Sequence, residues 1–261
     1  MRSEARRRGA GHPVRPIAPG RQQQPRPTRT LAIDIGGSGI KAGVLTEAGG
    51  LLGDRVRIET PVGRHPRVVV QAVHALVQPL ARFDRVSVGF PGVVAAGRVL
   101  TAPNLGHNGW LGFDLARALQ ERFRRPARIA NDVALQGLAV ITGRGLELVI
   151  TLGTGVGSAL FLDGLLVPQF MVGHQILRKG HTYDEQLNGA ALDHVGDRKW
   201  NRRLEKALRR LPELIRYDRL YIGGGNAKKI RFRVDARTTV VSNEAGIRGG
   251  IALWGTRYDT A

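Results

Sequence analysis

The feature that most constrains the fold is a pattern that occurs twice along the chain. In each copy an alternating apolar segment leads into a glycine-rich turn and then into a second alternating segment: LAIDIGGSGIKAGVL at 31–45 and LVITLGTGVGSALFL at 148–162. The copies align without a gap at an offset of 117 residues, which matches Asp34 with Thr151. Apolar alternation predicts strands. We therefore expect two antiparallel hairpins, and a repeat of this length favours a duplicated, two-lobed fold over chance similarity of two hairpins.

The glycine turns suggest phosphate binding, but neither turn has the spacing of a common nucleotide motif. GGSGIK (36–41) lacks the GxxxxGK[ST] pattern of a P-loop, and GTGVGS (153–158) leads into a strand rather than the helix of a dinucleotide-binding turn. Glycine allows the backbone to approach a phosphate closely and to direct its N–H groups at it. Two facing turns of this kind would hold a phosphate chain from both sides.

The rest of the chain alternates between strand and helix patterns. Helical spacing of apolar residues and turn residues predict helices at 66–82, 113–124, 133–142, 197–211 and 244–254. Further strands are predicted near 51–59, 85–90, 127–130 and 218–226, and the segment 168–183 is predicted to be irregular. The predicted helix at 197–211 carries seven basic residues, which is typical of a helix face in solvent.

Composition excludes several classes of protein. The chain has 261 residues and no cysteine, so disulfides, thiolate zinc sites and cysteine nucleophiles are excluded. Zinc is therefore not expected. No apolar run approaches the ~18 residues that span a membrane, and we expect a cytoplasmic protein without a membrane partner.

The chain is strongly basic. Eight arginines and one glutamate give residues 1–30 a charge of +7 out of a net +19, so residues 31–261 carry +12. This charge would attract a polyanion, although it is equally compatible with a solubility trait. The first thirty residues are rich in arginine and proline and lack an apolar core, which excludes a secretory signal. They predict a disordered basic tail, or an upstream start codon chosen in error.

Several motifs together carry a family resemblance. IDIGGSGIK resembles the first phosphate motif of the actin-like sugar kinases, TLGTGVG (151–157) the second, and IGGGN (222–226) the adenosine-side glycine motif. Five further segments occur in the order typical of the ROK family of sugar kinases and repressors: GFPGVV (89–94), TAPNLG (101–106), IANDVALQG (129–137), LDGLLVP (162–168) and VSNEAGI (241–247). The chain is most similar to the polyphosphate glucokinase-like branch, which lacks the cysteine zinc motif.

The resemblance implies an α/β chain with the two-lobed actin-like (ribonuclease H-like) sugar kinase fold and a duplicated βββαβαβα core. The tail at 1–30 would precede an N-terminal lobe at 31–131 and a C-terminal lobe at 132–243, and a helix at 244–261 would pack back on the N-terminal lobe. No helix-turn-helix pattern precedes Leu31, which disfavours the repressors of the family. A homodimer is also implied.

The resemblance assigns the chemistry to one carboxylate. Asp132 would act as general base, taking the proton of a sugar hydroxyl as that oxygen attacks phosphorus. Local sequence alone favours a different interpretation, because an Asn-Asp pair after a strand is an ordinary helix cap. The resemblance also implies that Asn131 and Asn104 hydrogen-bond the sugar hydroxyls.

The phosphate site is implied in the same way. Asp34 would hold a phosphate-bound Mg²⁺ through water, since Mg²⁺ keeps several waters and few carboxylates. Lys41 would add a positive charge, although a solvated strand lysine explains it equally well. The phosphate chain or nucleotide would be bound by three groups of residues: Gly36, Gly37, Ser38 and Gly39; Thr151, Gly153, Thr154 and Gly155; and Gly223, Gly224, Gly225 and Asn226.

The chain departs from the family pattern at the sugar site. The family motif Glu-x-Gly-His is here Met171-Val172-Gly173-His174, so the histidine is present and the glutamate is lost. A carboxylate binds a sugar diol by charge-assisted hydrogen bonds of about 1.5–3 kcal/mol each. Glu185 matches a second family glutamate that contacts sugar, although it also fits an exposed acid at a helix start. A further family aspartate is replaced by Ala134.

Two functions of different classes follow. The first is phosphoryl transfer from polyphosphate or ATP to the 6-hydroxyl of glucose or a related hexose, with Asp132 as base and Mg²⁺ as cofactor. The second is a catalytically impaired homologue that binds sugar or polyphosphate, marked by Met171. Lys228, Lys229, Arg231 and Arg233 follow the adenosine-side turn and would suit a polyphosphate channel or a solvated helix end. Nucleic-acid binding has only the basic composition in its favour, and no nucleic-acid partner is expected.

Overall fold

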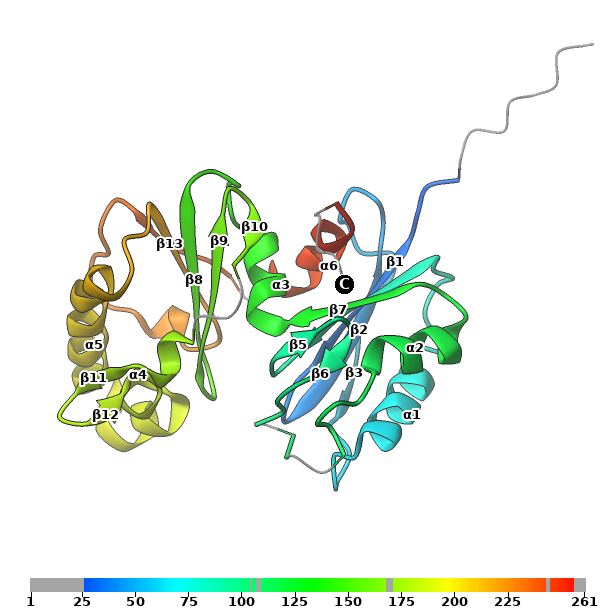
Figure 1. Cartoon of the computed structure of the whole chain (residues 1–261), viewed down its shortest axis with the longest axis horizontal. Helices are drawn as coiled ribbons and strands as arrows, with labels where there is room; N and C mark the ends of the chain where they lie inside the picture. The colour runs from blue at the N-terminus through cyan, green and yellow to red at the C-terminus, as the bar shows by residue number, and fades with distance from the viewer. Residues whose placement is uncertain (1–25, 104, 107–108, 168–170, 243–244, 256–261) are drawn as a thin grey trace, which may run out of the picture.

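Two five-stranded mixed sheets stand side by side, and two short helices lie between them (Figure 1). The structure is a computed structural model that describes residues 26–103, 105–106, 109–167, 171–242 and 245–255, with the side chains of 245–248 excluded. Asn104 and residues 1–25 lie outside the described residues. Within this part of the chain, no helix is long and apolar enough to cross a membrane.

The first sheet has the strand order β3-β2-β1-β4-β7. β1 pairs with β2 in antiparallel and with β4 in parallel orientation, and β7 extends the parallel side. The strands are β1 (Thr30–Ile35), β2 (Gly39–Leu45), β3 (Val56–Glu59), β4 (Arg85–Phe90) and β7 (Ala127–Asn131).

The second sheet repeats this arrangement with the order β10-β9-β8-β13-β14. The first strand of each half is central, its antiparallel partner lies on one side and two parallel strands lie on the other. The strands are β8 (Leu146–Leu152), β9 (Val156–Leu162), β10 (Leu165–Leu166), β13 (Arg219–Gly223) and β14 (Thr238–Val240). The identical topology confirms the duplicated core predicted from the sequence repeat.

The two hairpins differ by one residue in their turns. In the first, Ile35 pairs with Ile40 and four residues form the turn. In the second, Leu152 pairs with Val156 and three residues form it. The gapless alignment at an offset of 117 is therefore correct for the first strand of each hairpin and wrong by one residue for the second. Side chains alternate between the two faces of a strand, so only the corrected register keeps inward residues matched with inward residues.

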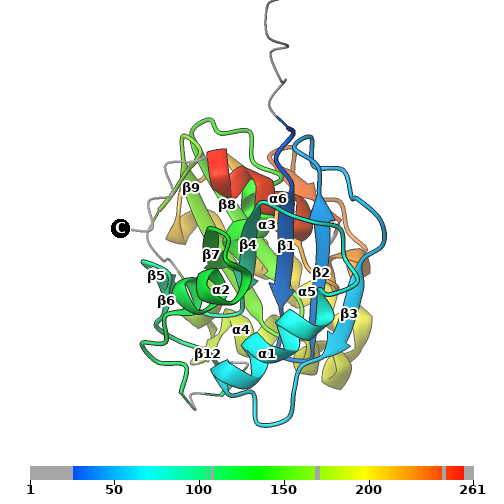
Figure 2. The ribbon, with the colours of Figure 1, turned by 90° about the vertical axis from the view of Figure 1, so that its right-hand side faces the viewer.

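Helices cover the outer faces of both sheets. In the first half, α1 (Pro66–Leu76) and α2 (Leu115–Phe123) bury apolar side chains against β1 and β4, and Figure 2 shows both helices on the near side of that sheet. In the second half, α4 (Tyr183–Leu187) precedes the long helix α5 (Gly189–Leu214), whose Trp200 and Leu204 belong to the same buried cluster as the apolar residues of β8. The helix predicted at 197–211 is the second part of α5, after a kink at Gly196, where φ is 73°.

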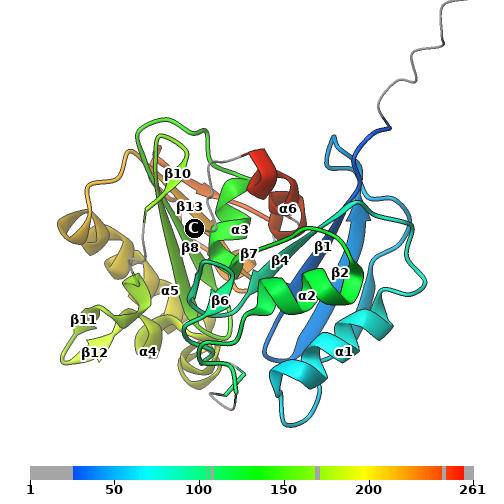
Figure 3. The same cartoon turned by 45° about the vertical axis from the view of Figure 1, so that its right-hand side comes forward.

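Helices α3 (Asp132–Leu138) and α6 (Ala245–Gly255) fill the space between the sheets (Figure 3). α3 packs against Phe161 and Tyr221 of the second sheet, whereas α6 packs against β1 and β4 of the first. The two helices also contact each other. A Cβ at Gly249 would overlap the carbonyl oxygen of Leu135, so glycine is required for this close approach.

Several boundaries differ from the predictions. α1 ends at Leu76, before Gln78-Pro79, because the residue before proline avoids the helical region. α3 ends at Leu138, and the backbone N–H groups of Thr142 and Gly143 bind the buried carboxylate of Glu147 instead of continuing a helix. The segment 168–183, predicted to be irregular, contains three short elements among its described residues: η1 (Val172–His174), β11 (Ile176–Arg178) and β12 (His181–Thr182). Short elements elsewhere are β5 (Val94–Ala95), β6 (Arg98–Val99) and η2 (Ala227–Lys229).

Candidate phosphate and sugar site

The first glycine turn is held closed by its own backbone. The Gly36 N–H donates to the Gly39 carbonyl over 2.9 Å, and the Thr60 hydroxyl donates to the Gly36 carbonyl over 2.6 Å. A Cβ on Gly36 would lie 2.8 Å from the Gly39 oxygen, so a larger residue cannot replace this glycine without a backbone shift. The turn therefore has one tight conformation, with Ser38 exposed at its tip.

The second turn is fixed by residues from two other segments. Gly153 N–H donates to the Gly155 carbonyl over 3.0 Å. Asp184 of α4 accepts a hydrogen bond of 2.7 Å from the Val156 N–H, and Asn226 Nδ2 donates to the Gly153 carbonyl over 3.2 Å.

The glycine motif at 222–226 thus packs directly on the second glycine turn. Gly224 has φ +90°, and a Cβ there would overlap the backbone of Leu152. The structure brings Thr151, Gly153, Thr154 and Gly155 together with Gly223, Gly224, Gly225 and Asn226.

Asp34 lies in a row of polar side chains across the first sheet. Asp34 pairs with Lys41, and Lys41 pairs with Arg57, so the three project from the same face. Lys41 Nζ is 4.0 Å from Asp34 Oδ2, and the two side chains are 49% and 43% exposed. Although the Asp34 side chain reaches solvent, the protein packed around its carboxylate raises the pKa of Asp34, and the Lys41 charge opposes this shift. Because the pair is open to solvent, we assign it little stabilising energy.

Asp132 begins α3 at the carboxyl end of β7. Burial raises the pKa of Asp132 to about 7, and the negative charge of Asp34 reinforces this shift. A 2.8 Å hydrogen bond from the Val133 N–H to Asp132 Oδ1 acts in the opposite direction and lowers the pKa. Gly89 of β4 lies next to this residue: a Cβ on that glycine would be in ordinary van der Waals contact with Asp132 Cα, at 3.6 Å. A carboxylate with a pKa near neutrality is suited to general base catalysis.

Asn131 caps the helix that carries Asp132. Its Oδ1 accepts from the N–H groups of Val133 and Ala134 over 3.0 and 3.3 Å, and its Nδ2 donates to the Gly92 carbonyl over 3.0 Å. The structure thus shows the helix cap that local sequence favours. Sugar binding by Asn131 and by Asn104 stays a prediction, and Asn104 lies outside the described residues.

The segment with the altered sugar motif packs on the strand that follows the second turn. The Val172 N–H donates to the Ser158 hydroxyl over 2.9 Å, and a Cβ on Gly173 would overlap the carbonyl oxygen of Val156. Met171 is half-buried and His174 is exposed. The His174 side chain has no hydrogen bond or ion pair with other residues in the described part of the chain.

Glu185 is occupied by a capping box at the start of α4. Its carboxylate accepts from the Thr182 N–H over 2.7 Å, and the Thr182 hydroxyl in turn accepts from the Glu185 N–H. Its side chain is 56% exposed and lies 3.6 Å from His181 Nδ1. The Thr182 N–H bond lowers the pKa of Glu185. The exposed helix-start acid is what the structure shows, and a sugar contact stays a prediction.

The carboxylates present suit a magnesium ion bound mainly by phosphate. The described residues contain no cluster of three metal-ligating side chains. Asp34 and Asp132 are near enough for the charge of one to raise the pKa of the other. One or two carboxylates, substrate phosphates and water are the ligands that Mg²⁺ prefers, so this donor set fits Mg²⁺.

Comparison with known proteins identifies the family. The model of the ROK family matches residues 30–185. The chain belongs to the ROK family. Its sequence is 32% identical over 237 residues to a polyphosphate glucokinase of Mycobacterium tuberculosis, covering 84% of this chain and 88% of the relative.

Solved structures of the ROK family agree in fold. The inorganic polyphosphate/ATP-glucomannokinase of Arthrobacter sp. strain KM is 34% identical, with a TM-score of 0.77 over 87% of this chain and 99% of that chain. A ROK family glucokinase of Streptomyces griseus, solved with glucose and AMPPNP, is 20% identical, with a TM-score of 0.71 over 86% of this chain and 98% of that chain. The predicted actin-like sugar kinase fold is confirmed.

Sequence reasoning overlooked Asp184, which supports the second glycine turn of this ROK protein. The only sequence signal is its place beside Glu185 in the first turn of a short helix, where acids are common. Its contact with Val156 joins residues 28 positions apart, and no local pattern predicts such a bond.

Proposed function

We propose that this chain is a glucokinase that transfers a phosphoryl group from polyphosphate or ATP to the 6-hydroxyl of glucose. The observation that carries the proposal is Asp132, a carboxylate with a pKa of about 7 beside Asp34 in a ROK fold with two glycine turns. Proteins of similar sequence and structure are a polyphosphate glucokinase and a polyphosphate/ATP-glucomannokinase.

In this proposal Asp132 accepts the proton of the 6-hydroxyl while the oxygen forms its bond to the terminal phosphorus. The bond between that phosphorus and the bridging oxygen breaks, and the shortened donor leaves with the electron pair. The two glycine turns hold the donor from both sides, and Lys41 adds a positive charge beside Asp34. Magnesium, held by Asp34 through water, would neutralise phosphate charge when bound.

The alternative is a homologue that binds its ligands but turns over slowly, because Met171 replaces the glutamate expected at the sugar site. Met171 directly precedes Val172, whose N–H is bound by Ser158, so a glutamate at position 171 would keep the same backbone conformation. The homodimer implied by the family also stays a prediction.

A coupled assay of glucose and other hexoses against ATP and polyphosphate tests the proposal. We expect glucose 6-phosphate to form in the presence of Mg²⁺ with at least one donor, and chelation of Mg²⁺ to stop it. No turnover with any hexose, together with retained polyphosphate binding, would favour the impaired homologue instead.

The support of the second turn gives a further prediction. Asp184→Ala removes the acceptor of the Val156 N–H, so the turn loses the contact that fixes its end. We expect KM for the phosphoryl donor to rise about tenfold, the effect of losing one hydrogen bond to a charged group, while KM for glucose changes little.

Asp193→Ala is the matched control, because Asp193 is an exposed carboxylate of the neighbouring helix α5. Steady-state kinetics with each substrate varied in turn separates the two KM values. An unchanged donor KM in Asp184→Ala would show that the turn keeps its shape without this contact.

A further inference from the structure

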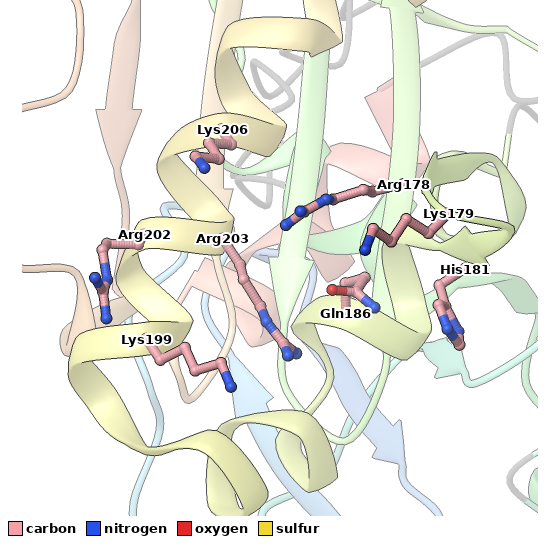
Figure 4. A pocket seen from close by; sticks show the side chains of 8 residues that line it. All are labelled: Arg178, Lys179, His181, Gln186, Lys199, Arg202, Arg203 and Lys206. Carbon is pink, nitrogen blue, oxygen red and sulfur yellow. The ribbon is translucent and has the colours of Figure 1, made fainter.

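A basic concavity of about 410 Å³ lies between α5 and the β11–β12 hairpin. Its charged lining is formed by the side chains of Arg178, Lys179, Lys199, Arg202, Arg203 and Lys206. Figure 4 shows Arg178 reaching from the hairpin toward α5, while Arg203 and Lys199 extend from the helix into the intervening space. His181 and Gln186 complete the lining, and none of these eight residues is acidic.

These cations lack partners within the described part of the chain. None of the six makes an ion pair or a side-chain hydrogen bond there. Elsewhere on α5, Arg209 pairs with Glu205 at 2.6 Å and Arg210 donates to the Leu177 carbonyl. Arg209 and Arg210 therefore have partners, whereas the four basic residues of α5 that line the concavity have none in the described part of the chain.

The arrangement of the cations is mildly unfavourable in the absence of a bound anion. Lys199 and Arg203 are four residues apart on one helix face, as are Arg202 and Lys206. Like charges at this spacing repel each other. Arg203 is also half-buried and has no carboxylate partner in the described part of the chain. Both features are typical of a surface that binds a multivalent anion.

The concavity is connected to the second phosphate turn through α4 and α5. Asp184 of α4 binds the end of that turn, and Gln186, two residues later, lines the concavity. α5 begins beside the same turn, since a Cβ on Gly189 would lie 3.2 Å from the Gly153 carbonyl oxygen. Lys199 is ten residues further along α5, beyond the kink at Gly196. A ligand that occupies both places must extend from the turn along α4 and α5.

We propose that this concavity binds the body of a long inorganic polyphosphate chain whose terminal phosphate occupies the glycine turns. The inference rests on the proposed function and identifies a second contact region for its donor. Polyphosphate fits because its charge is repeated along an unbranched chain. A nucleic acid of the same charge fits less well, because the lining has no Phe, Tyr or Trp side chain on which bases could stack.

The other basic segment of this lobe is a weaker candidate. Lys229 pairs with Asp197 at 3.3 Å, and Arg231 donates to the carbonyl of Lys228. Two of the four cations predicted to form a polyphosphate channel therefore have partners within the chain.

Binding to the full-length protein tests the inference without requiring turnover. The probes are a long inorganic polyphosphate, inorganic triphosphate and single-stranded DNA of matched charge, titrated by calorimetry at several salt concentrations. Arg178→Gln/Arg203→Gln removes two cations from the concavity, and Lys199→Gln/Lys206→Gln removes two exposed ones in case the first variant folds poorly. The control, Arg198→Gln/Arg216→Gln, removes two exposed arginines on or next to the same helix but outside the concavity.

We expect both concavity variants to bind long polyphosphate about tenfold more weakly and to lose about two units of salt-dependence slope. Triphosphate binding and ATP-dependent turnover should match the wild type, as should every property of the control. Unchanged binding of long polyphosphate would overturn the inference, and so would equal weakening of triphosphate binding. DNA that binds as tightly as polyphosphate and weakens equally in the variants would instead identify a nucleic-acid surface.

The inference and the proposed function can fail separately. A protein that phosphorylates no hexose, but whose concavity variants lose polyphosphate binding, contradicts the kinase activity alone. A protein that uses polyphosphate as well in the concavity variants as in the wild type contradicts the inference alone.

Discussion

Asp132→Asn is expected to lower the turnover of glucose by about 10²- to 10⁴-fold, the usual contribution of a general base. The asparagine keeps the size of the side chain and its ability to accept from the Val133 N–H, so α3 should retain its start. Calorimetric titration should show that the variant binds glucose and donor as the wild type does. A variant that turns over within a factor of about ten of the wild type would remove Asp132 from the chemistry.

The pH dependence follows from the same carboxyl group. Asp132 must be ionised to accept a proton, and its pKa is raised to about 7 by burial and by Asp34. We expect kcat/KM of the wild type to rise with pH through about 7 and to level off above it. Asp132→Asn should lose this rise in its residual activity. A flat wild-type profile between pH 5 and 8 would show that another group accepts the proton.

Asp132→Asn, which lowers activity, should raise the stability of the fold relative to the wild type. The pKa of Asp132 is higher in the folded state than its ordinary value of 3.8, so protonation stabilises the fold at low pH, and this contribution is lost as pH rises through about 7. Asparagine resembles the protonated acid. Without ligand or Mg²⁺, Asp132→Asn should therefore be more stable than the wild type at pH 8, by up to about 4 kcal/mol, and by less at pH 5. Urea unfolding at both pH values measures the difference.

Met171→Glu is expected to raise kcat/KM for glucose by about 10- to 100-fold. A carboxylate at this position would accept hydrogen bonds from two sugar hydroxyls, and one such bond contributes about 1.5–3 kcal/mol. The backbone that would carry it is already fixed, because Val172 binds Ser158 and Gly173 packs against Val156. The gain should appear mainly in KM for the sugar, with little change in KM for the donor.

Two variants separate charge from shape at this position. Met171→Gln keeps the length of the side chain without the charge and should give a smaller gain, while Met171→Leu should behave as the wild type. Kinetics with glucose and with other hexoses would show whether methionine weakens sugar binding in general or changes the preferred sugar. Equal activity of Met171→Glu and the wild type would mean that the sugar is held by other groups.

The elements that the sequence predicts well are those that repeat or alternate. The two hairpins, the strand before Asp132 and the helices with apolar faces are visible as local patterns, and the topology of the two sheets agrees with them. Turn length is not visible in the same way. The second hairpin turn is one residue shorter than the first, and a gapless alignment hides this difference because glycine occurs on both sides of it.

The contacts that join distant segments could not be predicted. Asp184 and Asn226 support the second turn from outside it, and their partners depend on how α4 and β13 pack. The same limitation affected the basic face of α5. From the sequence alone, its basic residues are typical of a helix face in solvent. Only the position of the β11–β12 hairpin shows that Arg178 and Lys179 lie across a concavity from them.

The last described helix, α6, packs on the first sheet, and this has a consequence for folding during synthesis. The inner face of the first sheet contains buried Ser87, whose hydroxyl donates to the Gly250 carbonyl and accepts from Trp254 Nε1. Arg128 donates to the Leu253 carbonyl and stacks on the Trp254 ring. All these partners lie in the last helix described. During synthesis on the ribosome, the strands of the first sheet therefore emerge long before α6, the helix that covers their inner face. Until α6 emerges, that face of the nascent chain must be protected from contact with other polypeptides.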